Sequence, residues 1–440
     1  MSDIADTAAT LTGYDPEAMD VGKVAAFLGT LLHGRPAPTP ETLSLRDSLG
    51  RVLARNVICP VDVPPHDNSA MDGYAFDGAA LDAKAEEVRL RVVGTVLAGA
   101  APPDAGGAGA GEALCITTGA VMPAGLDTVV PKEFCRLDGD IVRFSPTAVR
   151  RGANRRRAGE DLAAGRPALR QGDRLGSAAL GLVASLGLPT LQVHRRLRVA
   201  YFSTGDEILG LGEAPRTGAI YDSNRFTVFG MLDRLGCEVV DIGHVRDDPV
   251  ALEDALRDAA ARADAIVTSG GVSAGEADHT RHAMQRVGDM AFWRVAMRPG
   301  RPMAVGLVRR SETGGGTSVL FGLPGNPVAV MVAFLALVRP ALLGMMGCNE
   351  ASRAPAPLMR ARSVSAIAKR PGRTEYQRGF VRAARPGSVD GMPEVSVAPD
   401  QGSGILRSMV EANALVVLPH GQGDVAAGDL VDVMMLDGLL

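Results

Sequence analysis

The stretch Arg198-Val-Ala-Tyr-Phe-Ser-Thr-Gly-Asp-Glu207 decides the fold of the central part of the chain. A short run of β-branched and aromatic residues ends in a glycine turn, as expected of a buried strand that leads into a loop. Similar runs follow at 238–242, 265–269 and 319–322, with helix-like segments between them. This alternation is typical of a parallel sheet with helices on both faces, so we predict a three-layer, doubly wound α/β domain over residues 197–347.

Three further domains are expected around it, since 440 residues exceed one ordinary core. Residues 56–159 are rich in Val, Gly and Ala with short strand-like runs, which predicts a small, mostly β domain. Residues 352–440 contain strand-like runs between glycine turns, which favours a C-terminal β-barrel. Apolar, helix-like stretches in the remaining sequence suggest one discontinuous connecting domain made of residues 1–55 and 160–196. The predicted fold class is therefore multidomain α/β.

The charge balance and the cysteines exclude several classes of protein. Lys and Arg number 46 against 50 Asp and Glu, so no global field attracts nucleic acid or an anionic membrane. The first twenty residues are acidic rather than basic and then apolar, unlike an export signal. Five scattered cysteines without CxxC spacing indicate neither a disulfide framework nor a zinc site. We expect a cytoplasmic protein that binds neither nucleic acid nor a membrane.

Glycine-containing loops follow the predicted strands. Thr204-Gly-Asp-Glu207 follows the first strand, and the loop that begins Ser269-Gly-Gly-Val-Ser273 follows the third. Ligands of open parallel sheets bind where the strands end, and glycines let backbone N–H groups approach a phosphate closely. These loops predict an anion site, with an ordinary turn as the alternative. Gly322-Leu-Pro-Gly-Asn-Pro327 has the same strand-to-helix setting, and a plain capped helix is its alternative.

Carboxylates lie in or beside the first two loops. Glu207, Asp247 and Asp278 would repel a bare phosphate, but Mg²⁺ between them and the phosphate reverses the sign of the interaction. We therefore predict these three residues as metal ligands. The alternatives are that Glu207 is a solvated turn residue and that the neighbouring Asp248 caps a helix.

Three arginines cluster in Trp293-Arg-Val-Ala-Met-Arg-Pro-Gly-Arg-Pro302. If the segment from Arg294 to Arg298 is extended, these two side chains point to one face and would suit a tetrahedral oxyanion. Solvated surface arginines are the alternative. The Pro-Gly-Arg-Pro sequence, which fixes the backbone, favours a functional role.

The stretch Pro65-His-Asp-Asn-Ser-Ala-Met-Asp-Gly-Tyr-Ala75 resembles the signature of the molybdopterin molybdenumtransferases, the bacterial MoeA proteins and the corresponding domain of gephyrin. The resemblance continues in family order over nearly the whole chain. It implies a homodimer of elongated, four-domain subunits, with each cleft formed between the α/β domain of one subunit and the small β domain of the other. It also implies an enzyme that takes adenylylated molybdopterin and molybdate, uses Mg²⁺, and releases AMP and the molybdenum cofactor. Its implied partners are a molybdopterin adenylyltransferase and the proteins that accept the cofactor.

The resemblance and the loops together give three sets of site residues. The catalytic acidic set is Asp72, Asp161, Glu207, Asp247 and Asp278, of which the last three also hold Mg²⁺. The pterin and nucleotide path is Thr118, Gly119, Thr204, Gly205, Ser269, Gly270, Gly271, Ser273, Pro299, Gly300, Pro324, Gly325 and Asn326. The oxyanion set is Arg294, Arg298, Arg301, Arg378 and Ser403.

The sequence departs from the family pattern in two places. Arg294, Arg298 and Arg301 stand where the family generally carries lysine, and a planar guanidinium holds anions differently from an ammonium group. A Gly/Ala-rich insertion at 98–111 is the second departure. A non-catalytic scaffold of the gephyrin type is the alternative function. The intact acidic set favours the enzyme.

Overall fold

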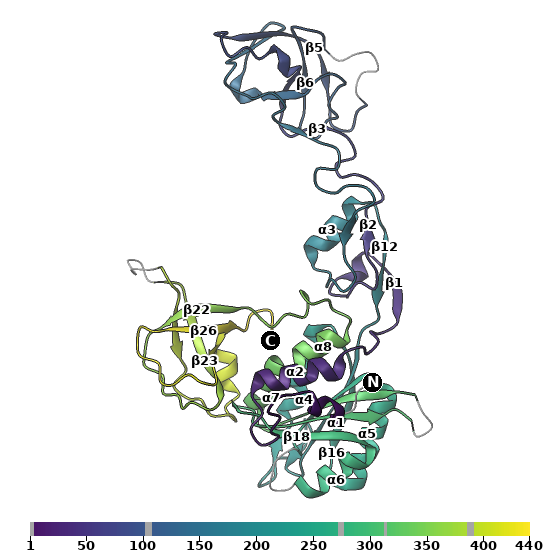
Figure 1. Cartoon of the computed structure of the whole chain (residues 1–440), viewed down its shortest axis with the longest axis vertical. Coiled ribbons are helices and arrows are strands. Elements are labelled where there is room, and N and C mark those ends of the chain that lie inside the picture. Colours follow the sequence, from purple (N-terminus) through teal and green to yellow (C-terminus); the bar gives the residue numbers. More distant parts are fainter. Residues whose placement is uncertain (1–3, 102–107, 272–276, 312–314, 385–390) are drawn as a thin grey trace.

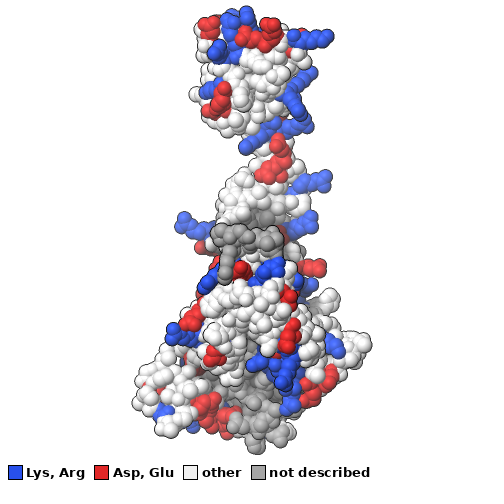
Figure 2. Space-filling view, turned by 90° about the vertical axis from the view of Figure 1, so that its left-hand side faces the viewer, with Lys and Arg blue, Asp and Glu red and all other residues white. Residues whose placement is uncertain are grey.

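The computed structural model describes residues 4–101, 108–271, 277–311, 315–384 and 391–440, without the side chains of 277–281. The molecule is elongated: a small β domain stands at one end, a slender connecting region follows, and the α/β domain and a β-barrel lie side by side at the other end (Figure 1). Acidic and basic side chains are interspersed over the face seen in Figure 2. The predicted multidomain α/β fold is confirmed.

The α/β domain contains a six-stranded sheet of order β16-β13-β17-β21-β20-β18. The first four strands are parallel, and β20 and β18 add an antiparallel edge that the sequence did not predict. Helices α4, α7 and α8 pack on one face and α5 and α6 on the other, which confirms the three layers. The strands are β13 (Arg198–Thr204), β16 (Glu238–Val245), β17 (Ala265–Ser269), β18 (Gly288–Arg294), β20 (Pro302–Arg309) and β21 (Thr317–Leu323). The helices are α4 (Ser223–Leu235), α5 (Pro249–Arg262), α6 (Ala277–Val287), α7 (Pro327–Ala333) and α8 (Arg339–Met345).

Carboxylates fix the first turns of α4 and α5. Asp222 accepts a hydrogen bond from the Arg225 amide at 3.0 Å, and Asp248 accepts from the amides of Val250 and Ala251 at 3.0 and 2.9 Å. Such bonds satisfy amide groups that have no partner inside the helix. The alternative reading of Asp248 as a helix cap is therefore correct.

One long apolar helix runs through α7, the π-helical turn η4 (Phe334–Val338) and α8. An 18-residue window of this 19-residue helix has a mean hydropathy of 2.2, enough by length and composition to cross a membrane. Most of the helix is buried, and its side chains share one core with those of α2, α4 and the sheet. The apolar character is thus accounted for by packing inside the α/β domain.

The N-terminal helices α1 (Ile4–Ala9) and α2 (Val21–Leu32) pack differently from the prediction for residues 1–55. Val24, Phe27 and Leu31 of α2 are buried in the same cluster as α8 and Trp293 of the α/β domain, and the Phe27 and Trp293 rings meet edge to face at 4.8 Å. Only the part from β1 onward packs with residues 162–193. The apolar face of α2 was visible in the sequence, but its partner was not.

The connecting region and the small β domain contain the remaining elements of the first half of the chain. The connecting region has β1 (Pro40–Ser44) paired with β12 (Thr190–His194), β2 (Val57–Ile58) paired with β11 (Pro167–Leu169), η1 (Arg46–Ser48) and α3 (Ser177–Ser185). The small domain has a six-stranded sheet of order β7-β4-β6-β5-β9-β8 with a core on each face. Its elements are β3 (Asn68–Ser69), β4 (Gly73–Phe76), η2 (Gly78–Ala80), β5 (Val88–Val96), β6 (Glu112–Ile116), β7 (Thr128–Pro131), η3 (Lys132–Phe134), β8 (Arg136–Asp138), β9 (Ile141–Phe144) and β10 (Arg155–Arg156).

The C-terminal strands close into a five-stranded barrel, as predicted, because β23 pairs with both β24 and β25. A sixth strand, β19 (Met297–Arg298), comes from the α/β domain and pairs in parallel with the start of β23, at Thr374 and Glu375. The barrel elements are β22 (Leu358–Ser363), β23 (Thr374–Arg382), β24 (Glu394–Val397), β25 (Ala414–Leu418), β26 (Leu430–Met435) and the helix α9 (Arg407–Glu411). The α/β domain and the barrel therefore share a sheet.

Candidate functional site

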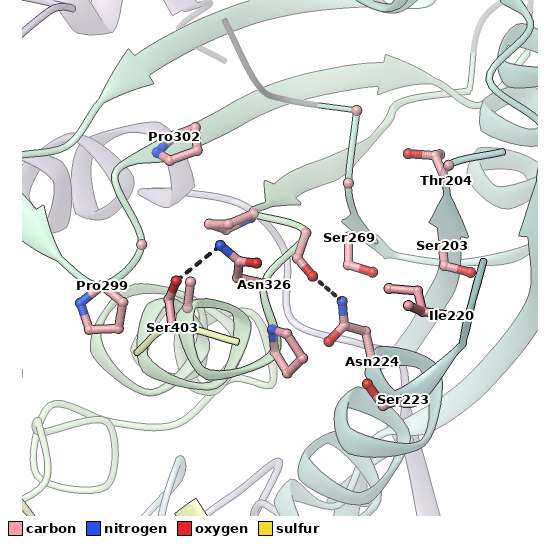
Figure 3. A pocket seen from close by; sticks show the side chains of 18 of the residues that line it. Ser203, Thr204, Ile220, Ser223, Asn224, Ser269, Pro299, Pro302, Asn326 and Ser403 are labelled. Carbon is pink, nitrogen blue, oxygen red and sulfur yellow. Dashed lines mark hydrogen bonds between the residues drawn. The ribbon is translucent and has the colours of Figure 1, made fainter. Parts of the chain in front are cut away.

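A cavity of about 830 Å³ lies at the carboxyl ends of β13, β17 and β21, where the α/β domain meets the barrel. The turn after each strand supplies part of its wall, as expected for an open parallel sheet. The short strands β14 (Ile208–Leu209) and β15 (Ile220–Tyr221) flank the first turn. Figure 3 shows side chains from these loops, from α4 and from the barrel loop at Ser403 converging on one space.

Most of the predicted site residues of the α/β domain line this cavity. They are Thr204, Gly205, Glu207, Asp247, Ser269, Gly270, Gly271, Arg298, Pro299, Gly300, Arg301, Pro324, Gly325, Asn326 and, from the barrel, Ser403. Ser273 and the side chain of Asp278 lie outside the described residues. The sequence thus located the cavity by its loops, although the residues come from segments up to two hundred positions apart.

Gly270 and Gly205 form a tight junction between the first two turns. Gly270 has a φ of +90°, and a Cβ added there would lie 2.9 Å from Thr204 Oγ1 and closer still to the Thr204 carbonyl oxygen. Gly205 has a φ of +138°, and a Cβ there would meet the Glu207 carboxylate at 2.6 Å. Both positions therefore require glycine for conformation, and Gly270 requires it for space as well, because a Cβ there would meet the Thr204 backbone. The backbone can come close to a ligand at this point.

Hydroxyl and amide groups line the wall beside the glycines. Ser203 donates to Asp222 at 2.5 Å, Ser269 shares a 2.6 Å hydrogen bond with Tyr201, and Asn224 donates to the Gly325 carbonyl at 2.7 Å. Thr204 Oγ1 and Asn224 Oδ1 are buried and have no hydrogen-bond partner among the residues that the structure describes. A buried polar atom without a partner costs free energy, so a ligand that bonds to these two atoms would recover it.

Two of the three predicted metal carboxylates reach the cavity. Glu207 folds back over Gly205, and the amide of Asp247 donates to Asp206 Oδ1 at 3.3 Å, which joins the turns after β13 and β16. The described residues contain no group of three or more His, Cys, Asp or Glu that could enclose a metal ion. Mg²⁺ usually takes only one or two carboxylates together with substrate phosphates and water. Glu207 and Asp247 fit that open kind of site.

Arginines from both domains also line the cavity. Arg298 and Arg301 line the cavity as predicted, and Arg373 of the barrel joins them. Arg373 Nε donates to Glu375 Oε1 at 2.8 Å, while an Arg298 nitrogen lies 4.0 Å from Glu375 Oε2. Glu375 is only 1% exposed, so a buried carboxylate fixes the Arg373 guanidinium by a hydrogen bond and attracts the exposed Arg298 guanidinium at longer range. The sequence analysis did not select Arg373.

Arg294 and Arg378 lie outside the cavity. Arg294 ends β18 and pairs on the surface with Glu17 at 3.1 Å, because the backbone leaves the α/β sheet before Arg298 enters the barrel sheet. Arg378 is 1% exposed and donates to Ser408 Oγ at 3.1 Å and to the Gly402 carbonyl at 2.9 Å. Burial lowers the pKa of Arg378, and the nearby positive charge of Arg298 adds to this. Arg378 therefore supports the loop that carries Ser403 and does not contact the cavity.

Ser403 connects the barrel to the start of α7. Its hydroxyl accepts a hydrogen bond from Asn326 at 3.0 Å, seen in Figure 3, and its carbonyl accepts from the Val328 amide at 3.0 Å. Gln401 and Gly402 of the same loop also line the cavity. The barrel therefore forms one side of the cavity.

The predicted site residues of the small β domain lie far from this cavity within the same chain (Figure 1). Asp72 accepts hydrogen bonds from the amide and hydroxyl of Thr118 at 2.7 and 2.8 Å, which lower the pKa of its carboxyl. Gly119 follows with a φ of +83°. Asp161 is exposed where the chain leaves the small domain, with its amide bonded to the Val63 carbonyl. Asp72, Thr118 and Gly119 form a second exposed group.

Comparisons with known proteins agree over almost the whole chain. Residues 19–187 match the model of the MoeA N-terminal region (domain I and II), residues 200–344 that of the probable molybdopterin binding domain, and residues 360–436 that of the MoeA C-terminal region (domain IV). The molybdopterin molybdenumtransferase of Haemophilus influenzae is 37% identical over 417 residues, which is 93% of this chain and 97% of that protein. That of Synechococcus elongatus is 35% identical over 90% of this chain and 94% of its own length. A solved MoeA structure from Pyrococcus horikoshii has a TM-score of 0.69 at 27% identity, covering 95% of this chain and 99% of that one.

Proposed function

This chain belongs to the family of molybdopterin molybdenumtransferases, and on that premise we propose that it inserts molybdate into adenylylated molybdopterin, with Mg²⁺, and releases AMP. The general role in molybdenum cofactor biosynthesis follows from the family. The observation that supports the detailed reaction is the single cavity in which a glycine-lined turn set, two carboxylates and three arginines face one another.

The phosphates of the substrate would lie against the glycine turns. Gly205, Gly270 and Gly271 expose backbone groups there, and the unpartnered Thr204 Oγ1 and Asn224 Oδ1 lie in the same wall. Phosphate oxygens accept from the Thr204 hydroxyl, and the Asn224 carbonyl oxygen accepts from N–H or O–H groups of the organic part. This division orients the substrate along the turns.

Glu207 and Asp247 would hold Mg²⁺ next to those phosphates. The bound ion would neutralise the negative charge that develops when the phosphoanhydride breaks. Both carboxylates lie on turns joined by the Asp247–Asp206 hydrogen bond, so their positions are coupled. Without a cation, each carboxylate would repel the phosphates that the glycine turns attract.

Molybdate is assigned to the arginine wall. Arg298, Arg301 and Arg373 carry three positive charges, and Ser403 adds a hydroxyl beside them. Guanidinium groups bind oxyanions through two parallel N–H bonds, and the buried Glu375 orients one of the three, Arg373, by a hydrogen bond. The phosphate and oxyanion positions then face each other across one cavity.

A homodimer would complete the site with Asp72 and Thr118 of the second subunit. Within one chain this pair is too far from the cavity to act on the same ligand (Figure 1). Ile220, which lines the cavity, is 60% exposed, and Leu211, Phe226 and Phe229 of the adjoining segments are 67%, 51% and 50% exposed. Exposed apolar side chains of this size are common at interfaces between subunits.

Intersubunit complementation tests the dimer. Asp72→Asn and Glu207→Gln should each inactivate the homodimer. A mixed dimer, purified by two different tags, has one cleft with both native residues, so it should recover about half of the wild-type activity. A mixed dimer as inactive as its parents would show that Asp72 serves its own chain.

The reaction itself is tested with purified protein, adenylylated molybdopterin, molybdate and Mg²⁺. We expect AMP and molybdenum-loaded cofactor to appear together and to depend on the protein. AMP release no faster than in a protein-free control would refute the proposal and favour a scaffold.

The five unpaired cysteines support the cytoplasmic location proposed here, where an adenylyltransferase and acceptor proteins are the expected partners.

A further inference from the structure

A second cavity, of about 340 Å³, lies at the other end of the parallel strands, where their amino ends meet. It is lined next to the amino ends of β13, β17 and β21 by Leu197, Asp264 and Thr317. The seven residues of β13 separate it from the first cavity, a distance of roughly 20 Å. Neither cavity shares a lining residue with the other.

Three arginines and one carboxylate line this second cavity. Arg195 binds Asp264 through both terminal nitrogens at 2.7 and 2.9 Å, and Arg310 adds a bond to Asp264 Oδ1 at 3.0 Å. The other carboxylate oxygen also accepts from the Arg198 amide at 2.9 Å. Both carboxylate oxygens of Asp264 therefore accept hydrogen bonds, and its one negative charge neutralises one of the three guanidinium charges.

Arg35 has no carboxylate partner in the described structure. Its terminal nitrogens donate to the carbonyl and hydroxyl of Thr317 at 3.2 and 2.7 Å, and its Nε is buried without a partner. Burial lowers the pKa of Arg35, and the positive charge of Arg310 lowers it further. Glu41 and Glu238 act on Arg195, but they pair with Arg51 and Arg198. Among the residues that the structure describes, two of the three guanidinium charges at the cavity thus have no carboxylate to neutralise them.

We propose that this cavity is a binding site for a dianionic phosphate group, separate from the site of molybdenum insertion. Two uncompensated guanidinium groups in a partly buried pocket match the charge of one phosphate monoester or free phosphate. The remaining wall is apolar, from Pro36, Pro38, Leu197 and Met345, which leaves room for a small carbon group on the phosphate. A phosphate monoester and free phosphate would bind through the same phosphate oxygens, but only the ester would also contact the apolar wall.

Calorimetric titration of the intact chain with phenyl phosphate and with inorganic phosphate tests the proposal. Arg35→Gln removes an uncompensated charge and leaves the bonds to Asp264 in place, and Arg310→Gln removes a second cation. Each should weaken binding at this site about tenfold or more, because a charge-assisted hydrogen bond is lost. Tighter binding of phenyl phosphate would identify an ester, and equal affinity a free phosphate.

Two matched variants separate the sites. Arg309→Gln changes the last residue of β20, which is exposed, lies next to Arg310 and is outside the cavity, and should leave binding unchanged. Arg298→Gln should weaken only an event at the first cavity. Absence of any phosphate binding that is sensitive to Arg35 and Arg310 in correctly folded variants, judged by circular dichroism, would overturn the proposal whatever the outcome of the insertion assay.

Discussion

Replacement of Gly270 by alanine should damage both the stability of the α/β domain and the shape of the first cavity. An alanine at a φ of +90° costs about 1–2 kcal/mol in backbone conformation. Its Cβ would also lie closer to the Thr204 backbone than the 3.0 Å that real Cβ atoms essentially never cross, so β13 and β17 must separate slightly. Such overpacking adds about 1–3 kcal/mol. The expected loss in free energy of unfolding is therefore about 2–5 kcal/mol.

Gly316→Ala is the matched control. Gly316 has the same φ of +90°, but nothing lies within 4 Å of an added Cβ. It should show the conformational cost alone. The difference between the two variants then measures the contact with Thr204.

Urea unfolding followed by tryptophan fluorescence measures both variants. The chain has one tryptophan, Trp293, which is 3% exposed on β18, so its emission reports on the α/β domain alone. Molybdenum insertion, measured in parallel, should fall only for Gly270→Ala, because only this change displaces the Thr204 turn. Equal stability of the two variants, within about 0.5 kcal/mol, would refute the reasoning.

The remaining predictions concern charged side chains. Arg298→Ala should raise the molybdate concentration required for half-maximal insertion, whereas Arg298→Lys should largely preserve it because a positive charge remains; an unchanged requirement in the alanine variant would contradict the oxyanion role. Arg378→Met should lower the free energy of unfolding of the barrel by about 1–3 kcal/mol, because the Gly402 carbonyl loses its hydrogen bond. It should also raise the molybdate concentration required, because the loop that carries Ser403 loses its support. A normal molybdate requirement despite the lost stability would show that Arg378 does not act on molybdate through Ser403. Burial acts to raise the pKa of Asp264, but hydrogen bonds from Arg195 and Arg198 outweigh it and hold the pKa below the ordinary 3.8. The stabilising contribution of the Asp264 carboxylate should therefore be complete above pH 3.8 and should decline as the pH falls through its lower pKa in the folded protein. The free energies of unfolding of wild type and Asp264→Asn should consequently become equal only in acid.

The α/β domain and its cavity were predictable because both depend on local patterns. Short apolar runs that end in glycine mark strands of a parallel sheet, and the carboxyl ends of such strands meet at one edge. Thr204 and Ser269 were therefore expected to be neighbours before any pairing was known. The antiparallel strands β18 and β20 gave no comparable signal, because the arginines between 293 and 302 predict one extended segment and do not show that two sheets meet there.

The arginines show where local pattern is insufficient. Side chains alternate along a strand, and Glu375 contacts Arg373 and Gln377 on its own face, whereas Arg378 points into the packing of the loop at 400–402. The motif Tyr376-Gln-Arg378 was visible in the sequence, but only the register of β23 shows which arginine faces the cavity. The expectation that Arg294 and Arg298 share one face was wrong for a related reason, because the strand assumed to join them is divided between two sheets, and only Arg298 lines the cavity.

Strand β19 has a consequence for how the protein can be divided. A fragment cut at the 352 boundary would lose the two residues that pair with Thr374 and Glu375, leaving that edge of β23 open to pairing with other chains. Such a fragment should aggregate more readily than one that retains a donated strand. The barrel therefore cannot be exchanged between relatives on its own. In evolution such an exchange would have to include the Met297–Arg298 segment, and with it an arginine that lines the cavity, as a single inherited unit.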